Sequence, residues 1–257
     1  MLVLTEKKHG VGWLTLNRPE ALNSLTAELA ADIVASVDAL AADPEVRVLV
    51  VSGAGRAFCA GGDLSSLKAL TDEKAAADFV KGCGKTSAAF YNCPKPVIAM
   101  VNGVAAGAGF NLALACDMVF AASGVKFIQS FSNIGLAPDC GGHYLLPRAV
   151  GCWRARQLMF EASPITAEQG KEAGFVNAVY PAEELADKTA EYAENLAKRA
   201  PLALAGCKRL LNEGENYSLA EMLAAEAELQ GKLVVSADCK EGLAAFAEKR
   251  PAKFQGK

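Results

Sequence analysis

Three short runs of apolar, mostly β-branched residues constrain the fold of this chain more than any other feature. They lie at residues 46–51, 97–101 and 118–121, and only Arg47 interrupts the first. A run of this length without polar alternation is typical of a strand that is buried on both faces. Helical stretches separate the three runs, so the order of elements predicts an α/β core.

Two further elements are predicted before the first of these strands. The first sixteen residues alternate around His9-Gly10, which indicates a β-hairpin, and Asn17-Arg18-Pro19 ends it. Thr26 is a candidate helix N-cap, because apolar residues follow it at helical spacing as far as Leu40. We expect that helix to stop at Asp43-Pro44.

The character of the sequence changes after residue 150, where Val and Ile become rare and Ala, Glu, Lys and Leu increase. The spacing of apolar residues there predicts one strand, at 176–179, and helices at 151–160, 166–172, 183–198, 201–211 and 218–237. We therefore divide the chain into an α/β core at residues 1–195 and a helical segment at residues 196–257. The helical segment is too rich in alanine to form a large core alone, so we expect it to pack on the core or on another subunit.

Composition and charge exclude several classes of protein. With 52% apolar and 21% charged residues, the chain is not of the intrinsically disordered class. No apolar run approaches the roughly 18 residues that a membrane-spanning helix needs. The net charge is -3 and the cations are dispersed, which is unlike a nucleic-acid-binding surface. The N-terminus shows no targeting segment, so we expect a cytoplasmic protein with no membrane or nucleic-acid partner.

Several common catalytic signatures are missing from the sequence. The eight cysteines are never closer than ten positions, so there is no CxxC pair for zinc or redox chemistry. His9 and His143 are the only histidines, which excludes an HExxH zinc helix, and the serine-hydrolase motif GxSxG is also missing. We therefore expect no metal site, and we expect the chemistry to use carboxylates, amides or the backbone.

Two glycine-rich turns, at residues 57–64 and 102–111, each lie where a predicted strand leads into a helix. Small residues there allow a ligand to approach the backbone closely. The first N–H groups of a helix have no intrahelical acceptor and lie at the positive end of its dipole, so they favour a developing negative charge. One amide from each turn would form an oxyanion hole.

Two other interpretations of the turns remain open on the residues alone. The glycines can simply make tight turns and allow close packing of helix on sheet. Gly107-Ala108-Gly109 also begins the dinucleotide-binding pattern GxGxxG, but Leu112 stands where the third small residue should be.

The ordered set of motifs along the chain resembles the crotonase superfamily, which contains enoyl-CoA hydratases and isomerases. The resemblance covers almost the whole chain. It rests on Asn17 to Asn23, Ala57 to Leu64, Pro94 to Gly103, Ala115 to Asp117, Gly135 to Asp139, Gly141-Gly142 through Pro147-Arg148, and Phe246 to Arg250. It implies a ββα spiral core with a C-terminal helical trimerisation segment, and an assembly that is a homotrimer or a homohexamer.

The same resemblance implies the residues of an acyl-CoA site. The backbone N–H groups of Gly62 and Ala108 would hold the thioester oxygen. Lys249 of the same or a neighbouring subunit would reach a CoA phosphate. Coenzyme A would enter as part of an acyl-CoA thioester substrate, so no bound cofactor is expected. The other implied substrate contacts are Arg18, Ala21, Ala60, Asp63, Leu64, Asn111 and Phe131.

The two glutamates that position water in hydratases of this family fall on Asn111 and Phe131 here. Neither side chain can exchange a proton with substrate at neutral pH. Asp139 is the remaining carboxylate, and its apolar neighbours would raise its pKa towards the range of a general base. Alternatively, Asp139 is only the cap of a helix that begins near Gly141.

We expect an enoyl-CoA isomerase in which Asp139 moves a proton between two carbons of the substrate. Residues 127–142 are most similar to the 1,2-epoxyphenylacetyl-CoA isomerase branch, which implies substrates derived from phenylacetate. Three alternatives remain: an enoyl-CoA hydratase, a dehalogenase-like use of Asp139 as nucleophile, and a non-catalytic binder of CoA thioesters. An RNA-binding relative would need a basic surface, and the net charge of -3 argues against one.

Overall fold

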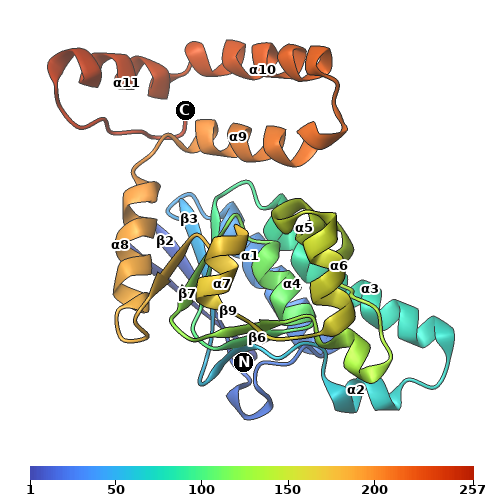
Figure 1. Cartoon of the computed structure of the whole chain (residues 1–257). Coiled ribbons are helices and arrows are strands. Elements are labelled where there is room, and N and C mark those ends of the chain that lie inside the picture. Colours follow the sequence, from blue (N-terminus) through green and yellow to red (C-terminus); the bar gives the residue numbers. More distant parts are fainter.

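Two β-sheets build the centre of the computed structural model, which describes residues 1–257 (Figure 1). Six strands form the larger sheet, in the spatial order β1-β2-β3-β5-β7-β10. Apart from the antiparallel pair β1 and β2, neighbouring strands in it are parallel. These strands are β1 (Val3–Lys8), β2 (Val11–Leu16), β3 (Val48–Gly53), β5 (Val97–Val101), β7 (Met118–Ala122) and β10 (Ala178–Tyr180).

The smaller sheet has the order β4-β6-β8-β9. It pairs β4 with β6 and β6 with β8 in parallel, whereas β9 runs antiparallel to β8. The strands are β4 (Ala57–Cys59), β6 (Val104–Ala106), β8 (Lys126–Ile128) and β9 (Ile165–Thr166). Because β4 and β6 are parallel neighbours, the turns that follow them leave the same edge of the sheet.

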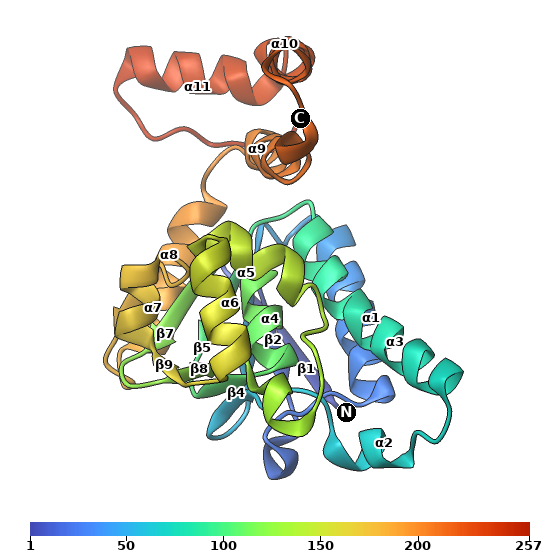
Figure 2. The same cartoon turned by 45° about the vertical axis from the view of Figure 1, so that its right-hand side comes forward.

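Helices cover the sheets and complete a core in which all six residues of β3 are buried. Helix α1 (Ala27–Ala42) packs on β1 and β2 and lies beside α3 (Glu73–Asn92), as Figure 2 shows, and α4 (Ala108–Leu114) contacts strands of both sheets. The other core helices are α2 (Leu64–Ala69), α5 (Gly142–Val150), α6 (Cys152–Glu161), α7 (Ala167–Ala173) and α8 (Leu185–Ala197), with 3-10 turns η1 (Pro19–Ala21) and η2 (Ser130–Ile134).

The local predictions for the first half of the chain are confirmed. The hairpin turns at His9 and Gly10, both of which have positive φ angles, as a tight two-residue turn requires. The Thr26 side chain accepts a hydrogen bond from the N–H of Leu29 and caps α1, and the helix ends at Ala42. The strand predicted at 46–51 begins two positions later, at Val48, and the N–H groups of Arg47 and Val48 both donate to the Gly10 carbonyl.

Three helices at the C-terminal end stand apart from the core in both views (Figures 1 and 2). They are α9 (Pro201–Glu213), α10 (Leu219–Val234) and α11 (Ala237–Glu248), with the 3-10 turn η3 (Gly214–Asn216) between the first two. Helix α8 packs on β3, β5 and β7, so the chain leaves the core between Ala197 and Pro201. The helix predicted at 218–237 is confirmed as α10, although it ends at Val234, because Ser236 accepts a hydrogen bond from Cys239 N–H and caps a separate helix, α11.

A partly buried ion pair joins this C-terminal lobe to the core. The Lys208 ammonium on α9 donates to Asp117 Oδ2 at 2.8 Å and to the Phe90 carbonyl at 3.0 Å. Asp117 also accepts from the Val97 N–H at 2.7 Å, at the start of β5. Burial raises the pKa of Asp117, and the charge of Lys208 opposes that shift. Asp117 is therefore a structural residue that connects α9 to the central sheet.

Candidate active site

The two glycine-rich turns are in direct contact. Gly61 has a φ of +103°, and a Cβ at this position would lie 2.9 Å from the Ala106 carbonyl oxygen and 3.6 Å from the Ala108 nitrogen. A Cβ on Gly109 would lie 2.0 Å from the Cys59 carbonyl oxygen. Only glycine allows the backbone of one turn to approach the other this closely. The parallel pairing of β4 with β6 thus delivers both turns to one place.

The backbone amides of Gly62 and Ala108 are among those in the two turns that have no acceptor within the protein. Leu25 N–H donates to Gly61 C=O at 2.7 Å, and Asp63 N–H donates to Leu25 C=O at 2.9 Å, so the N–H of Gly62 faces away from Leu25. The N–H of Ala108 is the first of α4, whose N-cap, Gly107, supplies no side-chain acceptor. Neither of the two predicted oxyanion-hole donors is therefore occupied by an acceptor of the protein itself.

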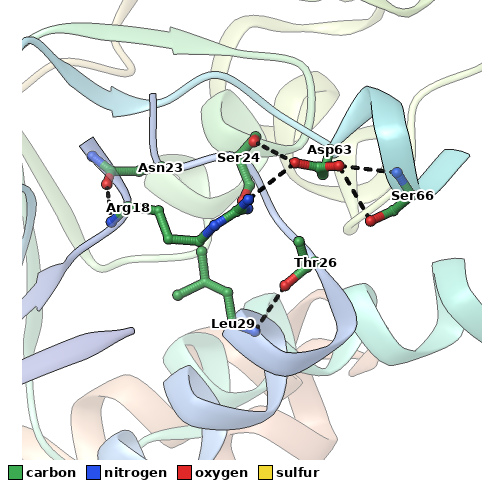
Figure 3. Close-up of polar contacts among 7 residues, drawn as sticks. All are labelled: Arg18, Asn23, Ser24, Thr26, Leu29, Asp63 and Ser66. Atoms are coloured by element: carbon green, nitrogen blue, oxygen red, sulfur yellow. Dashed lines mark hydrogen bonds and ion pairs between the residues drawn. The ribbon is translucent and has the colours of Figure 1, made fainter. Parts of the chain in front are cut away.

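A network around Asp63 holds the first turn in place (Figure 3). The Asp63 carboxylate accepts from Ser66 N–H at 2.9 Å, which caps α2, and from the Arg18 guanidinium at 3.3 Å. Arg18 also donates to the Ser24 carbonyl at 2.6 Å. The hydrogen bond from Ser66, followed by those from Arg18 and Ser24, lowers the pKa of Asp63. The charged groups of Arg18 and Asp63 thus bond to the protein itself. These bonds hold the chain next to Gly62 in place.

The other predicted CoA contacts divide into two groups. Ala21, Ala60 and Leu64 lie around the first turn: Ala60 N–H donates to Leu22 C=O at 3.0 Å, next to Ala21, and the Leu64 side chain is 59% exposed. Lys249 is the exposed C-cap of α11, in the lobe that stands apart from α2 (Figure 1). A single chain therefore does not bring Lys249 to the other predicted contacts.

Asp139 carries the most unusual side chain of the site. Its Oδ1 is buried and has no hydrogen-bond partner. Burial is the main reason why the pKa of this carboxyl is raised, although a hydrogen bond from Cys140 opposes the shift. The capping alternative is wrong, because α5 begins at Gly142 with Gly141 as its N-cap and no side-chain cap. Oδ1 of the Asp139 carboxylate is thus left without a hydrogen-bond partner in the protein.

Asn111 and Phe131 lie next to this machinery, but in different ways. Asn111 is fully buried, and its amide bonds only to the protein: Nδ2 donates to the Asp139 carbonyl at 2.8 Å, and Oδ1 accepts from Gln129 Nε2 at 2.7 Å. We expected Asn111 to contact substrate, and the structure instead gives both its polar atoms to the interior. The Phe131 ring covers the start of α4, with ring atoms 3.5 Å from where a Cβ of Gly107 would lie.

Gln129 was missed by the sequence analysis, because nothing in its local pattern distinguishes it from an ordinary residue near the end of a strand.

A second feature that the sequence did not predict is a cavity of about 490 Å³ beside the Asp139 loop. Leu136, Ala137 and Pro138 line one side of it, and Met159 and Phe160 of α6 the other. His143, which is exposed, also faces this cavity.

No helix of the structure is both long and apolar enough to cross a bilayer. The spiral of two sheets and the paired turns define a protein of the crotonase type. The profile of the family "Enoyl-CoA hydratase/isomerase" matches residues 6–257, and the chain belongs to this family. The resemblance seen in the motifs is therefore confirmed, as is the predicted α/β fold with its C-terminal helical region.

Individual relatives agree on the family and differ in activity. The chain is 41% identical to the 1,2-epoxyphenylacetyl-CoA isomerase of Escherichia coli, over 99% of this chain and 98% of the relative. It is 40% identical to a probable enoyl-CoA hydratase of Rhodobacter capsulatus, over 98% and 97%. A crystal structure of enoyl-CoA hydratase from Bacillus anthracis superposes with a TM-score of 0.96 at 31% identity, covering 100% of both chains.

Proposed function

We propose that this protein is an enoyl-CoA isomerase in which Asp139 is the proton-shuttling base. The observation that carries the proposal is the buried Asp139 Oδ1, which has no partner in the protein. A buried carboxylate without a partner is costly unless a ligand or a proton occupies it. The raised pKa of Asp139 fits a group that must both accept and return a proton.

The reaction requires one carboxylate and one place for negative charge. Asp139 takes a proton from C2 of a 3-enoyl-CoA thioester, and the electrons of that C–H bond delocalise onto the thioester oxygen. The N–H groups of Gly62 and Ala108 hold the resulting dienolate. Asp139 then returns the proton to C4, so that the double bond moves from C3–C4 to C2–C3 and no atom is gained or lost.

Hydration is the second candidate, and it is supported by relatives that are named hydratases. Hydration needs a positioned water, and the positions of the two family glutamates do not supply one here. Asn111 is buried and bonded within the protein, and Phe131 has no polar side-chain atom. We therefore place isomerisation first. We propose more specifically that the substrates derive from phenylacetyl-CoA. The support is the 41% identity to the E. coli isomerase.

Replacing Asp139 with Asn tests this function. We expect the conversion of 3-enoyl-CoA to 2-enoyl-CoA to fall about 10² to 10⁴-fold, with CoA-thioester binding retained. Asp38→Asn, on the exposed face of α1, is the matched control and should keep full activity. Undiminished isomerisation by Asp139→Asn would refute the role of Asp139. If the wild-type protein forms mainly 3-hydroxyacyl-CoA, this would favour a hydratase. If the wild-type protein binds CoA thioesters without turnover, this would favour a non-catalytic binder.

We also propose that residues 196–257 form the assembly segment of a trimer or hexamer. The support is the set of exposed large apolar side chains that this lobe presents: Leu219, Leu223, Val234, Val235, Leu243 and Phe246. Light scattering should then give a multiple of the 26.8 kDa chain mass, and a monomer would contradict the proposal. If a neighbouring copy supplies Lys249 to the CoA phosphate, Lys249→Ala should raise KM and leave kcat unchanged.

A further inference from the structure

A chain of two buried amides connects β8, α4 and the loop that carries Asp139. Gln129, just after β8, donates to Asn111 Oδ1 at 2.7 Å, and Asn111 donates to the Asp139 backbone carbonyl at 2.8 Å. The side chains of Asn111 and Gln129 are 0% and 1% exposed. The bond from Gln129 determines the orientation of the Asn111 amide, because Oδ1 must face a donor and Nδ2 then faces the carbonyl of Asp139.

The loop that these amides hold has an unusual backbone. Cys140 has a φ of +46° and Gly141 a φ of +81°, so two consecutive residues after Asp139 are left-handed. A non-glycine residue in this region is strained and persists only where its surroundings hold it there. The next residue, Gly142, packs directly on Asn111: a Cβ there would lie 2.5 Å from Asn111 Nδ2. Asn111 therefore supports this loop by direct contact.

The amide chain also carries a cost. Gln129 Oε1 is buried and has no partner, and leaving a buried acceptor unpaired is unfavourable. Apolar residues of similar volume would fill the same interior space without that cost. The two amides hold one backbone carbonyl in position, which apolar side chains of the same volume would not do.

We infer that Asn111 and Gln129 are positioning residues, which place Asp139 relative to the Ala108 amide. Asn111 follows Ala108 by three residues on α4, so the oxyanion-hole donor and the support of the base lie about 4.5 Å apart along one rigid turn. Moving a reacting group by about 1 Å can cost about 10²-fold in rate. The inference rests on the proposed role of Asp139 as the base.

Asn111→Leu removes the donor and keeps the side-chain size. We expect kcat for 3-enoyl-CoA to fall about 10²-fold while KM stays within about twofold, because the substrate contacts are untouched. The acid limb of the pH profile should also shift, since the Asp139 carboxyl then lies in altered surroundings. Gln129→Met should lower kcat less, about tenfold, because it frees the Asn111 amide to rotate without removing it. Leu112→Met, equally buried on α4, is the packing control and should keep wild-type kcat.

A double-variant cycle separates this inference from the proposed function. If Asn111 acts through Asp139, adding Asn111→Leu to Asp139→Asn should cause no further loss of rate. Full activity of Asp139→Asn alone would defeat the proposed function. Loss in Asp139→Asn combined with wild-type kcat in both Asn111→Leu and Gln129→Met, or with additive losses in the cycle, would overturn only the positioning role. If Asn111→Leu does not fold, Gln129→Met in the same cycle decides.

Discussion

Replacing Lys208 with Met tests whether a partly buried ion pair holds the C-terminal lobe on the core. The Lys208 side chain is 9% exposed, and its ammonium bonds to Asp117 Oδ2 at 2.8 Å, to Phe90 C=O at 3.0 Å and to Lys95 C=O at 3.4 Å. Methionine fills a similar volume but leaves the Asp117 carboxylate with only the Val97 N–H as partner. We expect a marked loss of stability.

The magnitude follows from the burial of the pair. Removing one partner of a fully buried pair costs about 3–5 kcal/mol, because an uncompensated charge remains. The Asp117 side chain is 26% exposed, so we take the lower end, about 3 kcal/mol. With an unfolding entropy of about 2 cal/mol/K per residue, this lowers the melting temperature by about 6 °C.

The assay is thermal and urea unfolding, followed by circular dichroism at fixed protein concentration. Lys232→Met is the matched control, because its ion pair with Glu228 is on the surface, with side chains 71% and 70% exposed, and it should leave the midpoint unchanged. Asp117→Asn added to Lys208→Met should recover part of the loss, because it removes the unpaired charge and keeps an acceptor for Val97 N–H. Equal midpoints for Lys208→Met and the control would refute the reasoning.

The loss in Lys208→Met should also depend on pH. Burial raises the folded-state pKa of Asp117 above its unfolded value, and removing Lys208 removes the charge that opposes this shift. The folded state then binds the proton more tightly than the unfolded state does. The deficit relative to wild type is therefore largest at neutral pH and shrinks as the pH falls through the raised pKa. A deficit that grows on acidification would contradict this account.

Four further predictions concern the site and the elements around it. An ordinary aspartate has a pKa near 4, and the pKa of Asp139 is raised above this value. We therefore expect kcat/KM to fall as the pH drops through the raised pKa, because the base becomes protonated. A flat acid limb in steady-state assays would contradict this. Gly109→Ala should cost about 3 kcal/mol or more, since its Cβ would lie 2.0 Å from the Cys59 carbonyl oxygen. Gly82→Ala, with open space around it on α3, should gain about 0.5–1 kcal/mol in the same urea titration. Thr166→Ala removes the capping box of α7 and should cost about 1 kcal/mol, and an unchanged urea midpoint would show that the cap is dispensable.

Most of the core could be predicted from the sequence, because local pattern determines local structure. The run at 97–101 became β5 with the predicted bounds, and Thr26 caps α1 as its spacing to Leu29 indicates. The helix predicted at 218–237 corresponds to α10 but was placed three residues too long at its C-terminal end, because Val234 and Val235 are apolar and only Ser236 marks the start of the next helix. The two glycine-rich turns were also found from sequence, since each places small residues between a strand and a helix.

The sequence by itself determined that two strands lead into glycine-rich turns, because this depends on neighbours along the chain, and the resemblance to the family then pointed to the amides of Gly62 and Ala108. Only the tertiary structure decided what the polar side chains do. Asn111 donates to a carbonyl 28 positions away, and Lys208 reaches Asp117 across 91 positions. The partner of a buried polar group depends on how distant elements pack, which no local pattern records. The same packing left one oxygen of the Asp139 carboxylate, Oδ1, buried and without a partner, and that is the feature on which the proposed chemistry depends.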